Sequence, residues 1–125
     1  LSASLIKQRG AVINISSVYG EVAGDRYAAY SASKGAIAML SRAVAVEIAA
    51  SGIRVNAVSP GVIETPFHER YSTPQMLETM RATIPMNRLG TADECAGAFL
   101  YLASDALSGY VTGQIIEVNG GQLMP

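Results

Sequence analysis

Residues 10–16 read GAVINIS, a short run rich in valine and isoleucine that begins with glycine and ends in serine. Its apolar side chains do not alternate cleanly with polar ones, as they would in a strand with one face in water. Such a run is typical of a strand that is buried on both faces, as the strands of parallel sheets are. We therefore predict a buried parallel strand here.

Two later segments have the same character. Residues 53–58, IRVNAV, form a second predicted strand, and we expect the Ser-Pro-Gly at 59–61 to end it. Residues 114–118, QIIEV, form a third, and the Asn-Gly-Gly at 119–121 turns the chain away.

The longest periodic segment spans residues 28–50 and predicts a helix that ends at Gly52. We expect Asp25 to cap its start. The helix has two apolar stripes, so one side should pack on the sheet and the other on a second subunit or another layer. The first stripe comprises Ile37, Leu40, Ser41, Val44 and Ile48, and the second comprises Ala36, Met39, Ala43, Val46 and Ala50.

The connection from residue 62 to residue 90 is long for a compact domain and contains three prolines. We predict a short helix at 75–82 within it, and we interpret the whole connection as a lid or binding loop. Thr91 then caps a predicted helix at 92–103, which has two acidic residues in its first turn.

The order strand, helix, strand, helices, strand predicts an α/β fold with about three parallel strands and helices on both faces. In such sheets, ligands bind outside the carboxyl ends of the strands. Ser17 directly follows the first strand, Pro60 and Gly61 follow the second, and the lid comes next. These features should therefore meet at one edge of the sheet.

Residues 17–34, SVYGEVAGDRYAAYSASK, place Ser17 thirteen residues before Tyr30 and Lys34 four residues after it. On a helix, side chains at i and i+4 lie on one face. An ammonium beside a phenol favours the phenolate, which suits Tyr30 to pass a proton.

The composition limits the classes of function. The chain has 125 residues, half of them hydrophobic, and a net charge of −1, which fits one domain with a real core and gives no electrostatic footprint for nucleic acid. It has neither an apolar run of about 18 residues nor a leader, so we expect no membrane span. One cysteine and one histidine are too few for a zinc site, and the single Cys95 fits a reducing, cytoplasmic compartment.

Five segments, in order, resemble the classical short-chain dehydrogenases/reductases, whose fold is a Rossmann-like doubly wound parallel sheet. They are NISS with Ser17 as its second serine, Tyr30-x-x-x-Lys34, RVNAVSPG at 54–61, Thr65 four residues after Gly61, and TGQIIEVNGG at 112–121. The terminal VNGG and the Pro-Gly-x-x-x-Thr element favour this family over the epimerases and dehydratases that share the Tyr-Lys pair.

The resemblance implies a role for each matched residue. Tyr30 would exchange a proton with the substrate oxygen, Ser17 would orient that oxygen, and Lys34 would bind the nicotinamide ribose. The cofactor, NAD or NADP, would also contact Pro60, Gly61, Ile63 and Thr65.

The implied reaction interconverts a secondary alcohol and a ketone. Polar lid residues point to a small hydroxylated substrate such as a sugar or polyol, with a 3-oxoacyl thioester as the alternative; they are Thr65, His68, Glu69, Arg70, Tyr71 and Ser72. Tyr19, Tyr27 and His68 are candidate substrate contacts beside Ser17. We expect Ser16 and Asn56 to be structural.

The family's glycine-rich TGxxxGxG turn and its NNAG stretch have no counterpart here. The chain thus resembles the C-terminal half of such an enzyme, a single partial domain over residues 1–125, and residues 1–10 resemble the tail of a helix. By itself it should be inactive and prone to associate, whereas the complete protein should form a homodimer or homotetramer. The alternative is a truncated or non-catalytic member that keeps the fold for binding or assembly.

Overall fold

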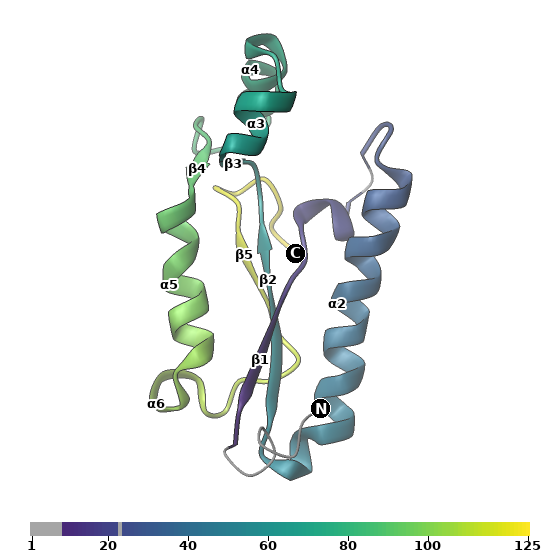
Figure 1. The fold of residues 1–125 in the computed structure, drawn as a ribbon, viewed down its shortest axis with the longest axis vertical. Coiled ribbons are helices and arrows are strands. Elements are labelled where there is room, and N and C mark those ends of the chain that lie inside the picture. The colour runs from purple at the N-terminus through teal and green to yellow at the C-terminus, as the bar shows by residue number, and fades with distance from the viewer. Residues whose placement is uncertain (1–8, 23) are drawn as a thin grey trace.

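The computed structural model describes residues 9–22 and 24–125. Three parallel strands form the main sheet in the order β1-β2-β5 (Figure 1); they are β1 (Ala11–Ile15), β2 (Arg54–Pro60) and β5 (Ile115–Val118). The register pairs Ile15 with Val58 and Pro60 with Val118. The predicted parallel sheet is therefore confirmed. The helix tail expected at the start of the chain falls mainly on residues 1–8, outside the described residues.

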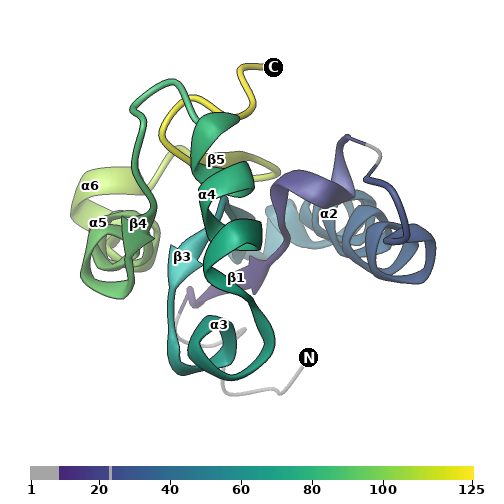
Figure 2. The ribbon, with the colours of Figure 1, turned by 90° about the horizontal axis from the view of Figure 1, so that it is seen from above.

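Helices cover both faces of this sheet, as the sequence predicts. Figures 1 and 2 show α2 (Ala28–Ile48) on one side and α5 (Ala92–Ala103) on the other. The core under α2 consists of Ala45, Ile53 and Val55, with Val12, Val44 and Ile48 packed against it. None of the helices in the described part of the chain is long and apolar enough to cross a bilayer.

The start of α2 differs from the prediction. Tyr27, not Asp25, occupies the N-cap position, and no side chain caps the helix there. Arg26, between the two, adopts the left-handed backbone conformation with φ of 65°, so the chain turns before the helix begins. Asp25 lies in solvent beside Arg26, at an Oδ2–Nε distance of 3.4 Å. The expected cap is therefore wrong, because this turn separates Asp25 from the first helical turn.

The end of α2 agrees with the prediction. A turn of 3-10 helix, η2 (Ala49–Ser51), follows α2, and Gly52 closes it with φ of 73°. Glycine adopts this conformation without a Cβ penalty, which is why it stops helices.

Strand β2 is longer than predicted, because it continues through Ser59 and Pro60. The Gly61 N–H donates to the Val118 oxygen at 2.9 Å, so pairing with β5 keeps the backbone extended beyond the proline. Asn56 in β2 is fully buried and bonds the backbone, as expected: its Nδ2 donates to the Val111 oxygen and its Oδ1 accepts from the Gln114 N–H, both at 2.9 Å.

The lid contains more structure than the single helix predicted at 75–82. That helix is α4 (Pro74–Ala82), and a further helix, α3 (Pro66–Tyr71), precedes it. Short strands β3 (Ile63–Glu64) and β4 (Gly90–Thr91) pair with each other and so hold the two ends of the lid together. Figure 1 shows α3 and α4 beyond the carboxyl ends of the strands. The threonine-proline pairs that open both helices, an N-cap followed by proline at N1, are the local signal for α3.

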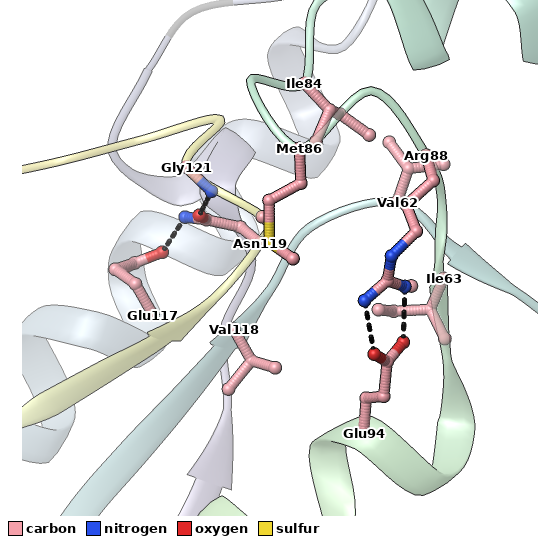
Figure 3. A pocket seen from close by; sticks show the side chains of 12 residues that line it. Val62, Ile63, Ile84, Met86, Arg88, Glu94, Glu117, Val118, Asn119 and Gly121 are labelled. Atoms are coloured by element: carbon pink, nitrogen blue, oxygen red, sulfur yellow. Dashed lines mark hydrogen bonds and ion pairs between the residues drawn. The ribbon is translucent and has the colours of Figure 1, made fainter.

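The Asn-Gly-Gly turn after β5 anchors the far end of the lid (Figure 3). The Met86 N–H donates to the Gly120 oxygen at 3.1 Å. A Cβ on Gly120 would lie 2.7 Å from the Ile84 side chain, so only glycine permits this approach. The Asn119 side chain fixes the turn, because its Nδ2 donates to Glu117 and its Oδ1 accepts from the Gly121 N–H, both at 2.9 Å. The last motif of the sequence thereby sets the position of the lid.

Helix α5 begins as predicted. Thr91 is its N-cap residue, and Glu94 accepts a hydrogen bond of 2.8 Å from the Thr91 N–H. A short helix, α6 (Asp105–Ser108), follows α5 and was not expected from the sequence.

Candidate active site

Ser17 lies where the chain leaves the carboxyl end of β1. It is the N-cap residue of a 3-10 turn, η1 (Val18–Gly20), and its Oγ accepts a hydrogen bond of 3.3 Å from the Tyr19 N–H. Its side chain is mostly buried, at 8% exposure. The turn therefore holds the hydroxyl in place at the end of the strand.

Close backbone contact joins this turn to α2. A Cβ on Gly20 would lie 2.8 Å from the carbonyl carbon of Lys34 and 3.0 Å from the nitrogen of Gly35. The Ser16 Oγ donates to the Lys34 oxygen at 3.0 Å, which is the structural role expected for Ser16. The segment that carries Ser17 is thus packed directly against the helix that carries Tyr30 and Lys34.

Tyr30 and Lys34 lie on one face of α2, one turn apart. The Lys34 Nζ lies 5.8 Å from the centroid of the Tyr30 ring and donates a hydrogen bond of 2.9 Å to the Ile15 oxygen. An ammonium has three donors, so two remain for other acceptors. The Tyr30 side chain is 43% exposed and can meet a small molecule.

A cavity of about 380 Å³, the Lys34 cavity, opens beside these residues. All the residues predicted to be catalytic or to contact the cofactor line it, although they come from separate elements. They are Ser17, Tyr30, Lys34, Pro60, Gly61, Ile63 and Thr65.

A second cavity of about 450 Å³, the Tyr27 cavity, adjoins the first, and Ser17 and Tyr30 line both. The predicted substrate contacts Tyr19, Tyr27 and His68 also line it. Several further residues that line this cavity were not identified from the sequence. Their only local signal was their position in the lid or near the end of the sequence. They include Phe67, Met80 and Gln122.

Aromatic rings form one wall of the Tyr27 cavity. Tyr19 and Tyr27 stack with centroids 4.9 Å apart and planes at 12°, and Tyr27 meets Tyr30 edge-on at 6.2 Å. Burial, and secondarily the neighbouring Tyr27 and Tyr30, raise the pKa of Tyr19 above its ordinary value of 10.0, so this phenol is neutral at physiological pH.

The lid contributes fewer polar groups to the cavities than its sequence suggests. His68 lines both cavities, and its Nδ1 lies 2.8 Å from the Ser72 Oγ. Thr65 lines the Lys34 cavity. Glu69, Arg70, Tyr71 and Ser72 line neither cavity; the Arg70 guanidinium instead lies over the Tyr71 ring at 5.4 Å.

Comparisons with known proteins show which family the chain is similar to. The family model described as "Enoyl-(Acyl carrier protein) reductase" matches residues 1–122. A 3-oxoacyl acyl-carrier-protein reductase of Thermotoga maritima is 44% identical over 94% of this chain and 47% of its own length. A 3beta-hydroxysteroid dehydrogenase of Eggerthella lenta is 40% identical over 94% of this chain and 45% of its own length.

A solved structure of a candidate gluconate dehydrogenase from Agrobacterium tumefaciens superimposes with a TM-score of 0.90 at 37% identity, covering 98% of this chain and 49% of that one. The chain thus spans about half the length of the relatives it matches. The parallel sheet has helices on both faces, and the family model matches nearly the whole chain. We conclude that the chain belongs to the short-chain dehydrogenase/reductase family and has half of its Rossmann-like fold.

Proposed function

We propose that the protein is an NAD(P)-dependent oxidoreductase that interconverts a secondary alcohol and a ketone. One observation carries the proposal: Ser17 and Tyr30 lie on the border of the two cavities, while Lys34 lines one of them. A substrate in the Tyr27 cavity and a cofactor in the Lys34 cavity would therefore meet at the hydroxyls of Ser17 and Tyr30.

The proposed mechanism assigns the proton to Tyr30. In the reduction, its phenol donates a proton to the carbonyl oxygen, while Ser17 Oγ donates a hydrogen bond to the same oxygen. When bound, NAD(P)H would supply the hydride that the carbonyl carbon takes up, and NAD(P)⁺ would take up a hydride in the oxidation. The ammonium of Lys34 lies 5.8 Å from the centroid of the Tyr30 ring and so places a positive charge beside the reacting phenol. The ketone, NAD(P)H and one proton thus become the alcohol and NAD(P)⁺.

The lining of the Lys34 cavity suits the nicotinamide and ribose end of a dinucleotide cofactor. Lys34 has two donors beyond its bond to Ile15, and these fit ribose hydroxyls. Thr65 is the N-cap residue of α3, yet its side chain makes no capping hydrogen bond, which leaves the hydroxyl for an amide or phosphate oxygen. The lack of a side chain at Gly61 lets a ligand approach the backbone. NAD and NADP are both compatible with these residues.

For the substrate, we propose a small hydroxylated compound of the sugar or polyol kind. The resemblance to the candidate gluconate dehydrogenase supports this class. The 44% identity to a 3-oxoacyl acyl-carrier-protein reductase favours a 3-oxoacyl thioester as the second candidate. A non-catalytic role in binding or assembly is the third possibility, and the presence of Ser17, Tyr30 and Lys34 together argues against it.

We also propose that the complete protein is a homodimer or homotetramer. The second apolar stripe of α2 is exposed, with Met39 at 60% and Val46 at 83%. An apolar helix face of this kind is typical of a protein interface. Light scattering of the complete protein measures its oligomeric state. Val46→Asp is expected to weaken the association between subunits. A wild-type protein that is monomeric would contradict the proposal.

The test of the function is the turnover of a panel of ketones by the complete protein with NADH or NADPH. Tyr30→Phe removes only the hydroxyl and is expected to lower kcat by about 10²-fold to 10⁴-fold. Tyr110→Phe is the matched control, because Tyr110 is fully exposed and lines neither cavity at the site. Wild-type kcat in Tyr30→Phe, or no binding of either cofactor, would contradict the proposal.

A further inference from the structure

The Tyr27 cavity has an apolar and aromatic lining. Around the two hydroxyls of Ser17 and Tyr30, its walls consist mainly of Val18, Tyr19, Tyr27, Val62, Phe67 and Met80. Its volume of about 450 Å³ lies within the range of roughly 300–1,000 Å³ that is usual for small-molecule pockets. His68 and Gln122 also line the cavity, so its polar atoms lie at the reacting end and at these two side chains, and most of the remaining wall is carbon.

Within the described residues, no aspartate, glutamate, lysine or arginine lines this cavity. Lys34 lines the other cavity and donates a hydrogen bond to the Ile15 oxygen. A charged group placed in an apolar cavity without a partner loses its hydration and gains nothing in return. Apart from His68, whose Nδ1 lies 2.8 Å from the Ser72 Oγ, the described lining offers a charged group no partner, which favours an uncharged substrate.

The shape of the wall is set by two rings that lie nearly parallel. Tyr19 comes from η1 and Tyr27 from the N-cap position of α2, so two elements hold the stack. Gly24 lies against both rings, and a Cβ there would approach within 3.0 Å of each. Phe67 and Met80 of the lid line the same cavity. Because the two rings stack on each other, they form a stiff part of the wall. A compact ring loses less rotational freedom when it packs against such a wall than a flexible chain does.

We propose that the Tyr27 cavity takes an uncharged cyclic secondary alcohol or ketone, with the ring against Tyr19 and Tyr27 and the oxygen at Ser17 and Tyr30. This inference rests on the oxidoreductase function proposed above. Among the hydroxylated substrates proposed there, it favours uncharged cyclic compounds over acyclic or anionic ones, so the resemblance to the candidate gluconate dehydrogenase does not support this narrower class. In the oxidation, the O–H proton of the substrate would pass to the Tyr30 phenolate and the C–O single bond would become C=O, with the hydride from the ring carbon taken up by bound NAD(P)⁺.

The test compares cyclohexanone with 2-hexanone, two uncharged ketones of equal carbon number, and with 4-oxocyclohexanecarboxylate. For the complete protein with NAD(P)H, kcat/KM is expected to be at least about tenfold higher for cyclohexanone than for 2-hexanone. The carboxylate is expected to be the poorer of the two cyclic ketones, because its charge has no partner in the cavity.

Tyr27→Leu keeps an apolar side chain but removes the flat ring. It is expected to lower the ratio of cyclohexanone to 2-hexanone kcat/KM by about threefold to tenfold, and Tyr27→Phe is expected to preserve the ratio. Tyr110→Leu is the matched control, since Tyr110 lies outside both cavities. Circular dichroism of each variant verifies that it is folded, and a Tyr19→Leu variant tests the other half of the same wall if Tyr27→Leu does not fold.

The outcomes separate this inference from the proposed function. Turnover of both uncharged ketones with equal kcat/KM overturns the ring preference and leaves the oxidoreductase function in place. An equal loss for both ketones in Tyr27→Leu also overturns it, because the ring would then be structural only. A protein that binds NAD(P)H but reduces no ketone overturns the proposed function, and the ring preference with it.

Discussion

The ammonium of Lys34 donates a hydrogen bond of 2.9 Å to the main-chain oxygen of Ile15, the last residue of β1. A side chain of α2 is thereby tied to the strand end that leads into Ser17. This charge-assisted bond joins α2 to β1 beside the hydrogen bond from the Ser16 Oγ to the Lys34 oxygen. Charge-assisted bonds are stronger than those between neutral groups.

Lys34→Met tests this bond, because methionine has similar length without the charge. With the ammonium gone, neither the Ile15 oxygen nor a ribose hydroxyl has its donor, so we expect kcat/KM to fall by about 10²-fold to 10³-fold, in line with loss of one oriented donor. Steady-state kinetics of the complete protein measure the change. Arg42→Met on the exposed side of the same helix is the control, and an equal loss in both variants would contradict the assigned role.

Gly20→Ala tests the contact between the Ser17 turn and α2. The added Cβ would lie 2.8 Å from backbone at Lys34, which cannot move as a side chain can. We expect the turn to shift, with a fall in kcat and a lower unfolding midpoint. Gly97→Ala is the matched control: its Cβ would meet nothing within 4 Å, and alanine inside helix α5 should add about 0.5–1 kcal/mol of stability. Wild-type kcat in Gly20→Ala would show that the turn tolerates the displacement.

Protonation of Glu94 is expected to lower the free energy of unfolding in acid. The Arg88 guanidinium, and then the Thr91 N–H, lower the pKa of Glu94 from 4.5 to about 2. The unfolded chain therefore binds this proton first, so the carboxylate contributes stability above pH 4.5 that is lost as the pH falls to about 2. Figure 3 shows the paired Arg88 and Glu94.

Urea unfolding of wild type and Glu94→Gln across this range measures the effect. The wild type should have a higher unfolding free energy than Glu94→Gln near neutral pH, and this difference should disappear toward about pH 2. Asp93→Asn, the neighbouring substitution in the first turn of α5, controls for the helix dipole. A difference that does not depend on pH would contradict the assignment.

The pKa of Glu117 is shifted in the opposite direction to that of Glu94. Burial is the main cause that raises its pKa above 4.5, and the nearby Glu21 adds to it, against the neighbouring Ser59 and the hydrogen bond from Asn119. The folded state holds this proton more tightly than the unfolded chain, so the carboxylate costs stability as the pH rises above 4.5. Glu117→Gln should therefore raise the unfolding free energy at neutral pH, by no more than about 1 kcal/mol because water screens a half-buried carboxyl.

Thermal unfolding at neutral pH and below pH 4.5 separates this effect from a change in packing. The gain should be present at neutral pH and disappear in acid. Glu47→Gln on the exposed side of α2 is the control. An equal gain at both values would mean that the amide simply packs better.

The elements that the sequence predicted are those with a strong local signal. Strands β1, β2 and β5 are short valine- and isoleucine-rich runs, and α2 ends at Gly52 because a left-handed stop is a local property. The errors lie where the local signal was overruled. Asp25 does not cap α2, since Arg26 turns the chain first, and β2 continues through Pro60, since Gly61 bonds to Val118 across the sheet.

The sequence by itself determined the family and the spacing of Ser17, Tyr30 and Lys34, because helix periodicity and strand ends are written in neighbouring residues. Only the tertiary structure decided what surrounds them. The contact of Gly20 with Lys34, the stack of Tyr19 on Tyr27 and the apolar lining of the Tyr27 cavity depend on how separate elements pack. The packing of separate elements determines which side chains line the same cavity, and these contacts cannot be predicted from patterns of neighbouring residues in the sequence.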